Sequence, residues 1–124
     1  MIKYILNWLS VAVASIAHLV VAVTNSMTAT IIVPLYMTDT EGVDLPALSA
    51  VVIPYLNGEL PLVVGVILAV ISAVGLGLAN YKETLRSYLP ILVALSMIVA
   101  MLHFAISWFA SALPLLKITT EVGA

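Results

Sequence analysis

Cysteine is absent from the 124-residue sequence. The chain therefore cannot form a disulfide, hold a metal ion through thiolates or use a cysteine nucleophile. The sequence also lacks a phosphate loop, a dinucleotide-binding fingerprint, a zinc-binding motif and a nucleophile elbow. We therefore expect a protein that is not an enzyme and has no metal site.

Charged residues are scarce as well. They make up 8% of the chain, whereas soluble domains carry about 25%. Hydrophobic residues make up 64%, so most of the surface must face lipid or other protein subunits rather than water. The net charge of −2 provides no basic surface, and we expect no sequence-specific binding of nucleic acid.

Three apolar stretches are each long enough to cross a membrane. They cover about residues 4–23 (with a continuation to 33), residues 60–79 and residues 88–112. A helix of about 20 apolar residues crosses a hydrocarbon core about 30 Å thick and satisfies its own backbone hydrogen bonds. The predicted fold class is an all-α integral membrane protein with three membrane-spanning helices, of which the last two form a tight helical hairpin.

Prolines and polar residues divide the chain into four segments. Residues 1–33 form an N-terminal membrane helix, which we expect to be retained because no small-residue cleavage site adjoins a short apolar segment. Residues 34–59 form an acidic loop and a short apolar helix from Pro46 to Leu56. Residues 60–112 form the hairpin, Pro114 closes the third span, and residues 113–124 are a C-terminal tail.

A few basic residues predict the orientation of the chain. Lys3 precedes the first span, and Lys82 and Arg86 lie between the second and third spans, whereas the loop after the first span carries only acidic charges. Because lysine and arginine concentrate in cytoplasmic loops, we expect a cell-membrane protein with its N-terminus in the cytoplasm and its C-terminus outside. Lys82 and Arg86 could bind lipid headgroups, or they could simply belong to a solvated loop.

The second span carries a row of small residues at a spacing of four. These are Gly65, Ala69, Ala73 and Gly77, with Gly75 beside them. Membrane helices associate where small residues let their backbones approach, so this row predicts a helix-packing interface, either within one chain or between copies. The alternative is that small residues are common in membrane helices and have no special role here.

The first and third spans each contain one histidine, His18 and His103, at a similar predicted depth. Two imidazoles at one depth could be axial ligands of a b-type haem, or could belong to a quinone or proton site. However, no carboxylate lies within a span to orient a ligating histidine. The other interpretation is that each neutral histidine hydrogen-bonds a neighbouring helix, in which case bound phospholipid is the only ligand that we expect.

The order of features over residues 46–112 resembles the conjugative pilins of type IV secretion systems and related archaeal DNA-transfer pilins. The matching features are a short apolar helix, a membrane helix rich in small residues, a basic loop with Lys82 and Arg86, and a second long apolar helix. The resemblance implies hairpins that stack into an extracellular pilus, with lipid between subunits and with Lys82 and Arg86 facing the lumen. The retained N-terminal span is a departure from these pilins, which are usually processed.

The sequence thus predicts a structural membrane subunit that associates with copies of itself and with lipid, most concretely as a pilin-like protein. Two alternatives stay open. One is an accessory subunit of a larger membrane redox complex, with a haem between His18 and His103. The other is a holin-like pore former, although holins commonly end in a highly charged tail and this chain does not.

Overall fold

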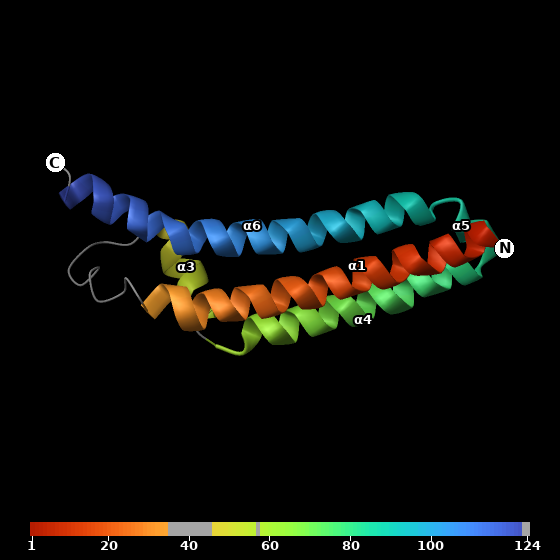
Figure 1. The fold of residues 1–124 in the computed structure, drawn as a ribbon, viewed down its shortest axis with the longest axis horizontal. Coiled ribbons are helices and arrows are strands. Elements are labelled where there is room, and N and C mark those ends of the chain that lie inside the picture. Colours follow the sequence, from red (N-terminus) through yellow and green to blue (C-terminus); the bar gives the residue numbers. More distant parts are fainter. Residues whose placement is uncertain (35–45, 57, 123–124) are drawn as a thin grey trace.

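A computed structural model describes residues 1–34, 46–56 and 58–122 (Figure 1). Its elements are all helices: α1 (Ile2–Met27), a π-helical turn η1 (Thr28–Ile32), α3 (Ala47–Leu56), α4 (Leu60–Tyr81), α5 (Glu83–Arg86) and α6 (Leu89–Val122). The described residues thus confirm the all-helical fold class. The acidic loop predicted after the first span lies mostly outside them.

Three of these helices are long and apolar enough to cross a membrane. They are α1, α4 and the part of α6 that ends at Pro114. Their bounds agree with the three predicted spans to within a few residues. The short helix α3 has 10 residues, which is too few for a crossing, and it forms where a short apolar helix was expected.

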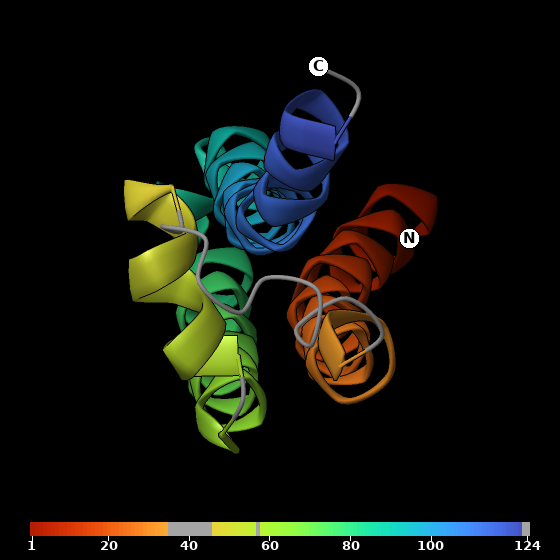
Figure 2. The ribbon, with the colours of Figure 1, turned by 90° about the vertical axis from the view of Figure 1, so that its left-hand side faces the viewer.

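The three long helices lie along one another in an elongated bundle (Figure 1). α1 and α6 run in one direction and α4 runs in the other, so that the N-terminus and α5 lie at one end and α3 lies at the opposite end. Viewed from the end that α3 occupies, the long helices form a triangle (Figure 2). α1 is the main partner of α4, although α4 and α6 are the helices joined by the short α5.

The closest approach between two helices lies where α4 meets α1. A Cβ atom placed on Gly65 would overlap the Cβ of Ala22 and would lie 3.0 Å from the carbonyl oxygen of His18. A larger residue at position 65 would therefore push the two backbones apart. Close backbone contact of this kind is a main source of helix association in lipid, where the hydrophobic effect between helices is weak.

Many of the buried side chains of the bundle are small or polar, and most of the bulky apolar side chains lie on its outside. The buried set includes Ala14, His18, Ala22, Ala79, Asn80, Ser107 and Ser111. On the outside, Val70 is 55% exposed and Leu102 is 54% exposed. A water-soluble bundle has the opposite pattern, with its apolar stripe inside and polar residues outside.

Pro114 lies inside α6, and the helix continues beyond it to Val122. The third candidate span ends at this proline, where the sequence predicts the end of the span, but the helix itself does not end there. Proline has no N–H to donate to the carbonyl oxygen four residues earlier, which belongs to Ala110. The hydroxyl group of Ser49 on α3 donates to that oxygen at 2.7 Å. A side chain of α3 therefore replaces the missing backbone bond, as hydroxyl groups do at other prolines within membrane helices.

Candidate functional site

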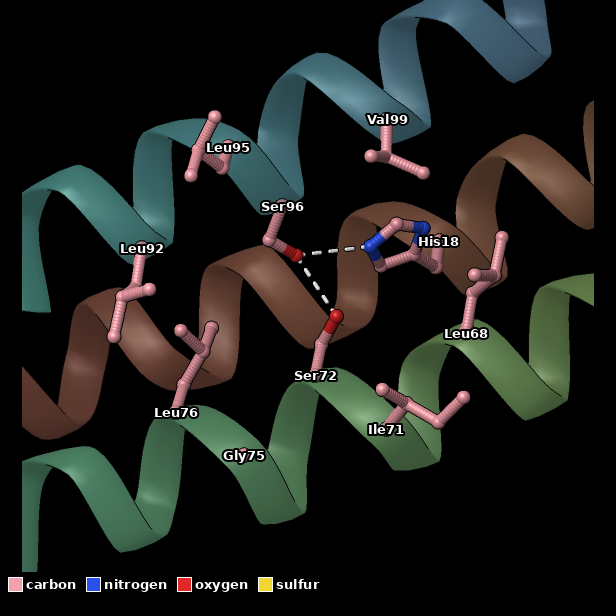
Figure 3. Close-up of a pocket in the computed structure, with 10 residues that line it drawn as sticks. All are labelled: His18, Leu68, Ile71, Ser72, Gly75, Leu76, Leu92, Leu95, Ser96 and Val99. Carbon is pink, nitrogen blue, oxygen red and sulfur yellow. Dashed lines mark hydrogen bonds between the residues drawn. The ribbon is translucent and has the colours of Figure 1, made fainter.

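Three polar side chains form a hydrogen-bonded chain that links the three long helices (Figure 3). The Oγ atom of Ser96 on α6 lies 2.9 Å from Nε2 of His18 on α1 and 2.8 Å from Oγ of Ser72 on α4. His18 is only 1% exposed, so water competes little for these bonds. The chain fixes the positions of α1, α4 and α6 relative to one another at one point of the bundle.

A cavity of about 360 Å³ lies beside this chain, between α4 and α6. Its polar lining consists of His18, Ser72 and Ser96 (Figure 3). The other lining residues are apolar: Leu68, Ile71, Gly75, Leu76, Leu92, Leu95 and Val99. Because Ile71 and Leu95 are more than half exposed, the cavity opens on the outer surface of the bundle.

A second cavity, of about 420 Å³, lies between α1 and α6. Its lining includes Val13 and Ile16 of α1 and Met97 and Phe104 of α6, and no polar side chain contributes to it. This cavity offers a ligand only apolar surface, because none of its lining side chains can form a strong hydrogen bond. The two cavities therefore differ in the chemistry of the ligand that each could hold.

The second histidine belongs to a different contact, between α6 and α3. The Nε2 atom of His103 lies 2.8 Å from the hydroxyl oxygen of Tyr55. Burial raises the pKa of Tyr55, so its hydroxyl group remains protonated at neutral pH. The Nε2 atoms of His18 and His103 thus have different hydrogen-bond partners, and both Nδ1 atoms are buried without one.

The residues that the structure describes include no group of three or more histidine, aspartate or glutamate side chains that could hold a metal ion. His18 hydrogen-bonds Ser96 between α1 and α6, and His103 hydrogen-bonds Tyr55 between α3 and α6. This arrangement matches the interpretation in which each histidine bonds a neighbouring helix.

The predicted row of small residues on α4 divides among different surroundings. Gly65 and Ala69 are buried in the bundle, and a Cβ atom placed on Gly77 would lie 3.6 Å from the ring of Trp8 on α1. Ala73 is exposed, and a Cβ atom on Gly75 would have no other atom within 4 Å. Residues four apart turn by about 400° along a helix, which is about 40° more than one full turn. The row therefore does not lie on a single packed face of α4.

The two basic residues between α4 and α6 have different environments. The Nε atom of Arg86 donates to the carbonyl oxygen of Asn80 at 2.8 Å, and its guanidinium lies 5.8 Å from the centre of the Tyr4 ring. A positive charge that bonds the last carbonyl groups of a helix stabilises its C-terminal end. Lys82 is exposed and is the more accessible of the two to a lipid headgroup or to a lumen.

Sequence reasoning did not single out several polar contacts between helices. Besides Ser49 and Tyr55 of α3, they include Asn7 on α1, whose Nδ2 donates to Oδ1 of Asn80 at 3.2 Å. Each of these residues is a polar side chain within an apolar helix. Such groups need a partner when they leave water, and this is the signal by which they could have been found.

No family model matches the sequence, and no characterised protein or solved structure matches it either. The similarity to conjugative pilins therefore rests on the order of features along the sequence.

Proposed function

We propose that this chain is a non-enzymatic structural subunit embedded in a membrane, where it assembles with copies of itself. Its apolar exterior carries the proposal. In the most apolar windows of α1 and α4 only 22% of the residues are buried, and in that of α6 only 11% are. Exposing so much apolar surface to water would be strongly unfavourable, whereas lipid and neighbouring subunits would cover it.

The proposed orientation places the N-terminus and α5 on the cytoplasmic side and α3 on the outer side of the cell membrane. The positions of Lys3, Lys82 and Arg86 at one end of the bundle support it. In this orientation α4 and α6 cross the membrane as an antiparallel hairpin. The most concrete form of the proposal is a pilin-like subunit, in which such hairpins stack into a filament with phospholipid between them.

The surface that we propose for self-association is the outer α6 face, defined by Ile91, Ile98, Leu102 and Phe109. Their exposed fractions are 61%, 49%, 54% and 58%. The spacings of seven, four and seven residues place them on one side of the helix. None of them lines either cavity, so a second copy could cover this face and leave both cavities open.

Cysteine cross-linking tests this proposal cleanly, because the natural chain contains no cysteine. Ile98→Cys and Leu102→Cys should form covalent dimers when native membranes are treated with an oxidant. Ala100→Cys is the matched control, because Ala100 is 2% exposed and faces the bundle interior. Monomers alone from both outer variants would exclude this face as the contact between copies. Electron microscopy of material sheared from cells would then show whether the assembly is a filament, as the pilin-like form requires.

The alternative of an accessory redox subunit is favoured by one observation, the buried Nδ1 atoms of His18 and His103 that have no partner. A ligand between the two helices could use them. The visible absorption spectrum of the purified native protein discriminates between the two functions. A sharp Soret band that is lost in both His18→Ala and His103→Ala would favour a haem-holding subunit over a purely structural one.

A further inference from the structure

We propose that the cavity between α4 and α6 binds a neutral lipid with a carbonyl head, of the quinone class, and that Ser72 donates a hydrogen bond to this head. The inference rests on the membrane insertion proposed above, and it does not depend on self-association. It combines three features of the site: the direction of the hydrogen-bonded chain, the size and opening of the cavity, and its depth.

The unpartnered Nδ1 atom of His18 sets the direction of the hydrogen bonds. A buried N–H without an acceptor is rarer than a buried acceptor without a donor, which favours the tautomer with its proton on Nε2. In that tautomer Nε2 donates to Ser96, and Ser96 in turn donates to Ser72. Among these three side chains the hydroxyl proton of Ser72 then has no acceptor, so it is available to a ligand in the cavity.

The cavity has the dimensions and walls of a small-molecule site. Its volume of about 360 Å³ lies within the range of about 300–1,000 Å³ that is typical of ligand pockets. Leu76 and Leu92 provide apolar walls, and the opening between Ile71 and Leu95 faces the outside of the bundle. A ligand dissolved in the membrane could therefore enter from the side without passing through water.

The depth of Ser72 within the membrane determines which kind of ligand head could reach it. Ser72 lies roughly 14 Å from the nearer end of α4, at 1.5 Å per residue. Phospholipid headgroups lie at the edges of a hydrocarbon core about 30 Å thick, and so about 15 Å from its centre. A charged headgroup therefore does not reach Ser72, whereas an uncharged carbonyl on a hydrophobic molecule does. A carbonyl oxygen accepts the bond that Ser72 has to offer.

The experiment measures the binding of decylubiquinone, a quinone with a short alkyl tail, to the full chain in lipid nanodiscs. Gly75→Leu should reduce the affinity at least tenfold, because its side chain would enter a cavity where a Cβ now meets nothing within 4 Å. Ser72→Ala should reduce it about three- to tenfold, the value of one hydrogen bond. Ala73→Leu is the matched control: Ala73 is exposed, lines neither cavity and should leave the affinity unchanged.

Decylbenzene, which has the tail but no carbonyl group, completes the experiment. We expect it to bind more weakly than the quinone and to be insensitive to Ser72→Ala. Equal quinone binding by the native protein and Gly75→Leu would overturn the site. Equal binding of the two ligands, together with no effect of Ser72→Ala, would overturn the carbonyl head and leave an acyl-chain groove. Thermal unfolding without ligand shows that each variant is folded, and the cross-linking of Ile98→Cys reports separately on self-association.

Discussion

The contact between α1 and α4 and the contact between α4 and α6 are built in different ways. The first is a close approach of two backbones, made possible by Gly65 against Ala22. The second includes a hydrogen bond from side chain to side chain, Ser72 to Ser96, with a cavity beside it. Close packing excludes ligands, whereas helices held apart by a polar bridge leave room for one. One face of α4 thus packs closely against α1, whereas another face borders the cavity.

This difference also explains why helices that are neighbours in sequence are not the closest partners in space. The short α5 connection brings α4 and α6 together, but α1 supplies the small residues and the carbonyl oxygen that face Gly65. In lipid, the fit between surfaces decides how closely two helices pack.

The largest effect should come from Gly65→Ala. The added methyl group would overlap Ala22, and overpacking of this kind costs about 1–3 kcal/mol of unfolding free energy. Reversible unfolding in mixed detergent micelles measures this loss. Gly75→Ala is the control, since its methyl group meets no atom and alanine is the better helix former.

A second substitution tests whether the overlap with Ala22 causes the loss of stability in Gly65→Ala. Ala22→Gly removes the methyl group that the new side chain would strike, so the double variant Gly65→Ala/Ala22→Gly should recover most of the lost stability. An additive loss in the double variant, or no loss in Gly65→Ala alone, would show that the two helices do not touch at this point.

The next largest loss of stability should come from removing the hydroxyl group of Ser49, which bonds α6 just before its proline. Ser49→Ala leaves the carbonyl oxygen of Ala110 without its donor, and we expect a loss of about 1–2 kcal/mol. Pro114→Ala restores a backbone N–H that can donate to the same oxygen. Ser49→Ala should therefore cost less in the Pro114→Ala background, and a double-mutant cycle from unfolding curves measures the difference. Equal costs in both backgrounds would mean that Ser49 does not compensate for the proline.

The number, type and approximate bounds of the long helices could be predicted because they depend on local hydrophobicity and length. The side of α4 that packs could not be read from the spacing of its small residues, since a row with a period of four drifts around a helix of 3.6 residues per turn. Gly65 and Ala73 belong to the same row in the sequence, yet Gly65 is buried against Ala22 and Ala73 is exposed. That distinction requires the position of α1.

The candidate site was only partly predictable for a related reason. The sequence alone identifies His18 as a candidate site residue, because an ionisable group within an apolar helix needs an explanation. Its partner Ser96 is 78 positions away in the sequence, and Ser72, which bonds Ser96, is 54 positions away from it. Serine is also common in membrane helices. The continuation of α6 beyond Pro114 is equally hidden in the sequence, because the donor that replaces the missing N–H comes from Ser49, on another helix.

The smallest effect should come from Ser96→Ala, which removes the centre of the polar bridge. Hydrogen bonds between membrane helices contribute about 0.6 kcal/mol each on average, so the loss of two should cost about 1 kcal/mol. Ser10→Ala is the control, because Ser10 is exposed and its hydroxyl donates to the carbonyl oxygen of Leu6 in its own helix. Unfolding in the same micelles measures both variants. A larger loss for Ser96→Ala than for Gly65→Ala would reverse the comparison, since the polar bridge, rather than close packing, would then be the main support of the bundle.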